Sequence, residues 1–426
     1  MRMLNRRLSP AYHQIDTISF IQPVQYVLQN GIPVYTFNEE DKELVRIEFI
    51  FANVNWDSTQ PLQAIGVNSL FNSGTASYSA EEIAAKIDYY GAFMQSDYGA
   101  DHLTITVYSL ERYLESLYPI LKSLFTVATF PQGELDIYIQ NQKQKLQVNL
   151  QKNDFLARKA FANAIFGDTP YGADITAAHY DGLSREALLA YYEAAFKPDN
   201  CTIIASGKFG ASQLALTDRI FGKDWHQQAV STPNHFQFAP QGAKKIALPR
   251  PDSVQNAIRL GGLAIQRHHP DFPALQVLNT VLGGYFGSRL MANIREDKGY
   301  TYGIGSGLAS LKHAGYFFIS TEVGSEVAKA ALTEIYHEMD RLRNEHIGQE
   351  ELDRVRNYML GSLLGSLENI FSHADKFKNL LFSGLDYPYY ERYIATVKEV
   401  DAPTLLGLAQ TYFDPENFTE LIVGKI

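Results

Sequence analysis

The chain has 426 residues, of which 46% are hydrophobic and 20% are charged, a composition typical of globular proteins. This length exceeds what one hydrophobic core usually serves, so two or more domains are expected. The formal net charge of −10 disfavours non-specific binding to nucleic acid or to anionic membranes. The single cysteine, Cys201, excludes an internal disulfide and any metal site built from several cysteines.

The first residues carry Arg2, Arg6 and Arg7 but lack the apolar run of a secretory signal. No segment approaches the ~18 consecutive apolar residues of a membrane-spanning helix. We therefore expect a soluble protein with no signal peptide in this chain and no membrane association. Its compartment, cytoplasmic or periplasmic, stays open.

Hydrophobic periodicity and turn residues predict the elements of the first half. Strands are expected over 23–37, interrupted by an Asn30-Gly31 turn, and over 43–53, 93–96, 103–110 and 200–206. Helices are expected over 62–71, over a segment opened by a Ser79–Glu82 capping box and closed before Gly91, and near 111–128, 134–165 and 185–196.

The second half repeats this order. Strands are expected near 255–264, 301–309, 315–323 and 418–424, and helices near 271–296, 325–346, 349–380 and 402–412. Adjacent strands mixed with helix pairs predict an α+β fold in which a largely antiparallel sheet has helices packed on one face.

Two separated motifs recur at one offset. Residues 196–208 share Phe, Pro, Asn, Thr, Gly and Lys with residues 413–425, and Glu134-Leu135-Asp136 recurs as Glu351-Leu352-Asp353. The spacing between the copies is the same for both motifs (413 − 196 = 351 − 134). This pattern indicates an internal duplication, with homologous domains at 1–223 and 243–426. The polar, aperiodic segment 224–242 is predicted to be the linker.

The stretch 281–303 combines a glycine-rich loop with two side chains that can bind an oxygen atom. Gly283, Gly284 and Gly287 allow the backbone to approach other backbone or a ligand closely. Arg295 is expected near the last turn of a helix and Tyr302 on the following strand. An arginine fork and a tyrosine hydroxyl can together hold a carbonyl oxygen or a carboxylate. The alternative is an arginine in a surface ion pair, a tyrosine in the core and glycines that serve close packing.

Motifs along nearly the whole chain, and the duplication itself, resemble the pitrilysin/insulinase superfamily of zinc peptidases, in particular the subgroup similar to mitochondrial processing peptidase. The motifs are Gln29-Asn30-Gly31-Ile32-Pro33-Val34, Leu70-Phe71-Asn72-Ser73-Gly74-Thr75, Gly283-Gly284-Tyr285-Phe286-Gly287-Ser288-Arg289-Leu290 and Ile294-Arg295-Glu296-Asp297-Lys298-Gly299-Tyr300-Thr301-Tyr302.

The resemblance implies two similar α+β domains that form half of a clamshell around a peptide chamber. It also implies that Arg295 and Tyr302 take the places of the family's Arg/Tyr pair, which holds the substrate carbonyl near the scissile bond. Gly283, Gly284 and Gly287 resemble, in shortened form, the glycine-rich loop of the non-catalytic processing-peptidase subunit.

The zinc motif is where this sequence departs from the family. An active member carries His-x-x-Glu-His on the helix before the Gly-Thr turn, and here those places hold Ile65, Asn68 and Ser69. The family's further glutamate ligand is expected within 140–150, which contains no carboxylate. The adjacent histidines His268 and His269 would point apart on a helix and could not chelate together. We therefore expect no metal in this chain.

These observations predict a non-catalytic subunit of a two-chain zinc metallopeptidase. Arg295 and Tyr302 would bind peptide and stabilise the oxyanion, and a homologous partner with His-x-x-Glu-His would carry the zinc. The edge strand at Gly91 to Asp97 is a further candidate for pairing with peptide, and the isolated chain could form a homodimer.

The alternative is a non-proteolytic scaffold or peptide-binding homologue, as the respiratory-complex core proteins of the superfamily are. The spacing of serines, histidines and aspartates gives no support to a self-sufficient hydrolase with another triad.

Overall fold

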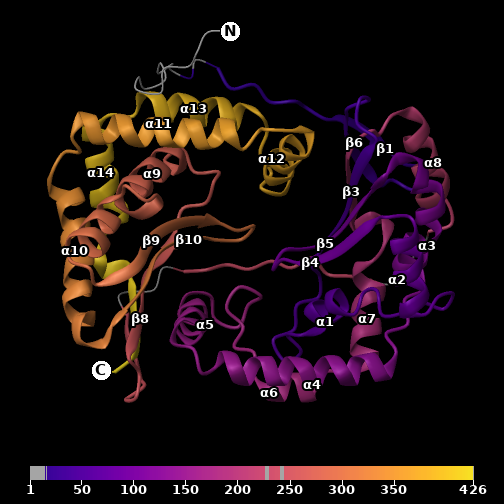
Figure 1. Cartoon of the computed structure of the whole chain (residues 1–426), viewed down its shortest axis with the longest axis horizontal. Helices are drawn as coiled ribbons and strands as arrows, with labels where there is room; N and C mark the ends of the chain where they lie inside the picture. The colour runs from indigo at the N-terminus through magenta and orange to yellow at the C-terminus, as the bar shows by residue number, and fades with distance from the viewer. Residues whose placement is uncertain (1–14, 16, 226–229, 240–243, 426) are drawn as a thin grey trace, which may run out of the picture.

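The computed structural model describes residues 15, 17–225, 230–239 and 244–425. It consists of two halves, each built from one mixed sheet and its own helices (Figure 1). The predicted α+β class with two duplicated domains is confirmed. The exact division at 223 and 243 stays a prediction.

The first half begins with a hairpin whose turn is formed as expected, because Gly31 adopts a φ of +93°. Its strands are β1 (Val24–Val27), β2 (Pro33–Asn38), β3 (Leu44–Ala52), β4 (Phe93–Tyr98), β5 (His102–Leu110) and β6 (Cys201–Gly207). Its helices are α1 (Gln63–Ser69), α2 (Ala80–Tyr89), α3 (Leu114–Thr126), α4 (Gln132–Asn149), α5 (Asn153–Phe166), α6 (Ala177–Asp181), α7 (Arg185–Ala195) and α8 (Ala211–Phe221), with short turns η1 (Glu111–Tyr113) and η2 (Pro198–Asn200).

The second half has five strands: β7 (Lys244–Pro249), β8 (Gln255–Ala264), β9 (Thr301–Ser310), β10 (Gly315–Gly324) and β11 (Thr419–Gly424). Its helices are α9 (Phe272–Asn279), α10 (Ala328–Asn344), α11 (Gln349–Gly365), α12 (Ile370–Phe382), α13 (Pro388–Glu399) and α14 (Ala402–Tyr412). Two π-helical segments, η3 (Thr280–Gly284) and η4 (Met291–Asp297), and two short turns, η5 (Ser325–Val327) and η6 (Pro415–Asn417), complete it.

The strand orders reflect the duplication. The first sheet has the order β1-β2-β6-β3-β5-β4 and the second β7-β11-β8-β10-β9. In each sheet one pair is parallel, β2 with β6 and β7 with β11, and the other pairs are antiparallel. Helices α4, α5 and α7 precede α11, α12 and α14 by the same offset as the sequence motifs (349 − 132 = 370 − 153 = 402 − 185). The predicted repeat therefore extends to the tertiary structure.

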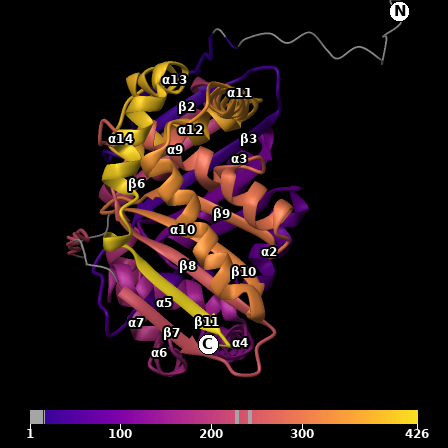
Figure 2. The same cartoon turned by 90° about the vertical axis from the view of Figure 1, so that its left-hand side faces the viewer.

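One helix from each half packs against the sheet of the other half. Helix α5, from the first half, packs Phe161 and Ile165 against Leu421 and Val423 of β11. Helix α12, from the second half, covers the first sheet, where Ile370 joins a cluster with apolar side chains of β2, β3 and β6. Figures 1 and 2 show both crossings, α5 beside β8 and β11, and α12 beside β6. Helices thus cover both faces of each sheet, although only one covered face was predicted.

A buried ion network holds α12 on the first sheet. On β3, Arg46 is 2.9 Å from the carboxylate of Asp375 and 3.2 Å from that of Glu48. The ammonium of Lys378 lies 2.6 Å from Glu48. Because Arg46 and Glu48 are almost fully buried, these pairs must be complete to offset the loss of hydration.

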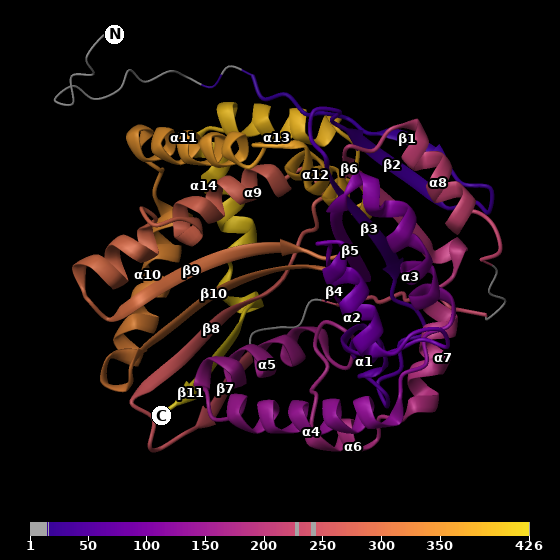
Figure 3. The ribbon, with the colours of Figure 1, turned by 45° about the vertical axis from the view of Figure 1, so that its right-hand side comes forward.

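Three helix predictions were wrong in length. The expected helix at 271–296 is interrupted between η3, which ends at Gly284, and η4, which begins at Met291. The expected helix at 134–165 is divided into α4 and α5, and that at 349–380 into α11 and α12. Lys152, just before α5, is extended, and Asn369 accepts hydrogen bonds from the amides of Phe371 and Ser372 to begin α12. The breaks before α5 and α12 redirect the chain toward the opposite sheet (Figure 3). Helices α8 and α13 and strand β7 were not predicted.

Part of the predicted linker lies within the described residues. There, Pro233 forms a β-bridge with Val54, and the Asn234 side chain accepts a hydrogen bond from the amide of Trp56. The segment is therefore attached to the first half. Throughout the described part of the chain, no helix combines the length and apolar character needed to cross a bilayer.

Candidate functional site

Helix α1 carries the three residues that stand where the family has its zinc motif. Ile65 packs against the core of the first half. Two hydrogen bonds join Asn68 to Ser96 of β4. The Ser96 hydroxyl donates to the side-chain oxygen of Asn68 (2.5 Å), and the side-chain amide of Asn68 donates to the backbone carbonyl of Ser96 (3.3 Å). Ser69 lies near the hydroxyl of Tyr138 on α4, whose pKa is raised by burial.

This donor set does not fit zinc, which takes imidazole, thiolate or carboxylate ligands. Isoleucine has no donor atom, and the amide of Asn68 is engaged with strand β4. Within the described ranges, no three His, Cys, Asp or Glu side chains are grouped so that they could hold a metal ion.

The predicted Arg/Tyr segment runs from η3 through η4 into β9. Gly299, with a φ of +65°, ends the helical part as expected. The amide of Tyr300 donates to the Ile294 carbonyl at 3.0 Å, which ties the start of β9 to η4. Arg295 therefore lies in the last turn of η4 and Tyr302 is the second residue of β9. The sequence placed both residues correctly, and their function stays a prediction.

Ion pairs anchor this segment on its inner side. Arg289 is largely buried and forms two hydrogen bonds of 2.9 Å with the carboxylate of Glu351 on α11. Such a two-point pair fixes orientation as well as distance. The Asn293 amide donates to Glu334 and Glu338 of α10. Nearby acids are therefore bound to residues other than Arg295.

Arg295 and Tyr302 themselves are available for binding. The Arg295 guanidinium lies 4.8 Å from the ring centre of Phe286, a cation–π arrangement. It forms no ion pair or hydrogen bond with any described residue. The Tyr302 side chain is 92% exposed and that of Phe286 is 61% exposed. The alternative reading, a surface ion pair and a core tyrosine, is therefore wrong for both.

The three glycines have different environments. Gly283 is buried, and a Cβ atom there would lie 2.6 Å from the backbone nitrogen of Ser306 on β9. Its small size is required for η3 to pack on β9. Gly284 and Gly287 are exposed, so their backbone is accessible. A role of the three in substrate binding stays a prediction.

Strand β4 lies at the edge of the first sheet, where the sequence placed a candidate strand for peptide pairing. Among the described strands, β4 pairs with β5 alone, in an antiparallel register. One of its outward groups, the Ser96 carbonyl, accepts the hydrogen bond from Asn68. An added peptide strand would therefore compete with Asn68 at this position.

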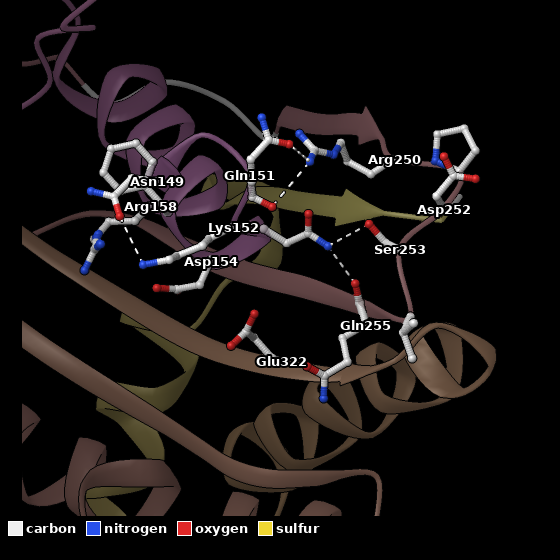
Figure 4. A pocket seen from close by; sticks show the side chains of 14 residues that line it. Asn149, Gln151, Lys152, Asp154, Arg158, Arg250, Asp252, Ser253, Gln255 and Glu322 are labelled. Carbon is white, nitrogen blue, oxygen red and sulfur yellow. Dashed lines mark hydrogen bonds between the residues drawn. The ribbon is translucent and has the colours of Figure 1, made fainter. Parts of the chain in front are cut away.

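A large polar pocket of about 1040 Å³ lies between the α4–α5 junction and the β7–β8 turn. Figure 4 shows hydrogen bonds among several of its side chains, whereas Asp154, Arg158, Asp252 and Glu322 form none with the residues drawn. Asn153 donates to the Ser253 hydroxyl and the Gln255 carbonyl, and Arg250 donates to the Leu150 and Gln151 carbonyls. We interpret this pocket as the joint that connects the two halves.

Sequence reasoning missed two residues of the Arg/Tyr segment. No role was predicted for Phe286, because no local pattern indicates that its ring packs against Arg295. The Arg289–Glu351 pair joins positions far apart in the chain, and no local pattern could have shown it.

Comparisons with known proteins agree with this geometry. A family model described as "Peptidase M16 inactive domain" matches residues 182–359. The chain is 24% identical to the uncharacterized zinc protease YmxG of Bacillus subtilis over 93% of this chain and 97% of that one. It is 23% identical to the non-peptidase homolog YmxG of Helicobacter pylori over 94% of each.

A crystal structure of a peptidase M16 inactive domain from Pseudomonas fluorescens superimposes with a TM-score of 0.85 at 22% identity, over 95% of this chain and 99% of that one. With its duplicated halves, its altered zinc positions and this likeness over nearly its full length, the chain resembles inactive members of the peptidase M16 family.

Proposed function

We propose that the chain is a non-catalytic subunit that binds peptide for a homologous chain carrying His-x-x-Glu-His. One observation carries the proposal: the zinc positions on α1 hold Ile65, Asn68 and Ser69, while Arg295 and Tyr302 form no side-chain hydrogen bond or ion pair with any described residue. A purely structural role of this segment does not require a guanidinium and a phenol without hydrogen-bond partners, whereas a role in peptide binding does.

The arrangement suits recognition of a peptide carbonyl. Stacking on Phe286 limits the motion of the Arg295 guanidinium, so less entropy is lost when it binds. The Tyr302 hydroxyl can donate a second hydrogen bond to the same oxygen. Donors fixed before the reaction stabilise a developing oxyanion without reorganisation. Cleavage itself would belong to the partner.

The first prediction concerns these two residues. In a peptidase assay on the mixed subunits, Arg295→Ala or Tyr302→Phe should lower kcat by roughly 10²-fold, the usual effect of removing one oxyanion donor. Matched controls are Arg112→Ala and Tyr89→Phe, since both side chains are well exposed and lie in the first half of the chain. Unchanged turnover in the two test variants would exclude the proposed role.

The partner is tested by purification from the native source. Recovery of a homologous chain with an intact zinc motif supports the two-chain peptidase. Recovery of a membrane complex, or of this chain alone, supports the scaffold alternative. Metal analysis of the isolated chain is an independent check, because stoichiometric, tightly bound zinc would contradict our interpretation of α1.

A further inference from the structure

A second pocket, of about 450 Å³, lies where the halves meet. Its walls come from β3, the β4–β5 turn, the loop after β8, the β9–β10 turn and α12. Its size is within the range that accommodates small ligands. Its residues are distinct from the Arg/Tyr segment and from the zinc positions on α1.

Arg267, which lines this pocket, has no counterion among the described residues. Its guanidinium forms no ion pair or hydrogen bond with any residue that the structure describes, and its Nε atom is buried without a partner. By contrast, Arg46, Arg259 and Arg289 each pair with a carboxylate. The Arg267 guanidinium lies 5.8 Å from the ring centre of Tyr389, but a partly buried cation without a counterion is costly, so an anionic ligand would stabilise it.

The surroundings of Arg267 favour an anion. Burial and the nearby charge of Arg267 both lower the pKa of Lys376, so the two cations repel each other. The two acids that line the pocket are already engaged. Asp101 accepts the Tyr171 hydroxyl at 2.5 Å and the Lys312 amide at 3.2 Å, and Asp97 accepts the Gln95 amide.

Two apolar side chains, Ile50 and Phe382, also line the pocket. The rings of His102 and Phe382 are 4.2 Å apart. Burial lowers the pKa of His102 to about 4, so this side chain is neutral at pH 7. A dianion such as phosphate would be repelled by Asp97 and Asp101 in the same pocket, more strongly than a monoanion.

We propose that this pocket binds the free α-carboxylate of a peptide. Arg267 would form a two-point pair with the carboxylate, and the last side chain of the peptide would lie against Phe382 and Ile50. This inference rests on the proposed function, because it assumes that peptides are the ligands. It assigns a preference for free carboxyl ends.

The test uses the full chain and a fluorescent hexapeptide with an apolar last residue, made as the free acid and as the C-terminal amide. Fluorescence anisotropy should show about 10- to 100-fold tighter binding of the free acid, since hydrogen bonds between charged groups are strong. Arg267→Gln should remove this difference and Arg267→Lys should retain part of it. The exposed Arg112→Gln is the matched control and should behave as the wild type.

The outcomes separate this inference from the proposed function. Equal binding of acid and amide, or no effect of Arg267→Gln, overturns the carboxylate site but leaves peptide binding intact. Stronger competition by inorganic phosphate than by acetate also overturns it. Failure of both peptides to bind contradicts the inference and the proposed function together. Because the Arg267 guanidinium has no described hydrogen bond to lose, its variants should fold.

Discussion

Gly283 lies so close to Ser306 that one added methyl group would collide with the backbone of β9. Gly283→Ala should therefore lower the free energy of unfolding by about 1–3 kcal/mol, the usual cost of overpacking. Gly361→Ala, in α11, is the matched control, because its Cβ would meet nothing within 4 Å. There alanine should stabilise the helix by up to ~1 kcal/mol. Urea denaturation measures both, and a neutral Gly283→Ala would contradict the packing role.

His102 makes stability depend on pH. Burial holds its folded-state pKa at about 4, below the usual value of about 6.5. Between these values the unfolded chain binds a proton that the folded chain does not, so stability falls as the pH is lowered from about 6.5 to about 4. This group contributes up to about 3 kcal/mol of that loss.

Urea denaturation across this pH range tests the prediction. His102→Gln should lose less stability on acidification than the wild type, whereas His337→Gln, at an exposed position on α10, should follow the wild-type curve. Parallel curves for His102→Gln and the wild type would show that another group causes the effect.

The residue-level predictions from sequence succeeded where a short motif set the backbone. Arg295 and Tyr302 were placed because the helix, Gly299 and the strand follow one another directly. The stacking of Phe286 and the missing counterion of Arg267 depend on side-chain directions and distant neighbours, which periodicity does not contain.

At the scale of elements, α12 depends on a charge network as well as apolar contacts. Arg46→Met should lower the free energy of unfolding by about 3 kcal/mol, because it leaves Glu48 and Asp375 without one of their partners. Arg112→Met should change little, since its pair with Glu43 is exposed. Thermal unfolding distinguishes the two, and an equal small effect would show that apolar packing alone holds α12.

Element prediction failed where a helix ends without a typical stop signal. Residues 150–152 contain no glycine or proline, so the boundary between α4 and α5 had no local marker. It exists because α5 must reach the second sheet, which is a tertiary requirement. The Ser79–Glu82 capping box, in contrast, was predicted and is formed.

At the scale of the whole molecule, the duplication was predictable and the exchange of helices was not. A constant offset between matching motifs can be found from the amino-acid sequence alone. The packing of α5 on β11, and of α12 on β6, requires knowledge of which face each sheet leaves open. The pocket at Arg267 arises only from that exchange, since its walls belong to both halves.

The exchange also affects how the protein is made. The first sheet is complete at Gly207, but α12 begins only at Ile370, after strands β7 to β10 of the second sheet have been synthesised. Until then a nascent chain leaves Phe37 and Ile50 without their cover. Uncovered apolar surface promotes aggregation during folding. During synthesis on the ribosome, the first half therefore cannot complete its packing until α12 of the second half has been made. Chaperones would be needed most in that interval.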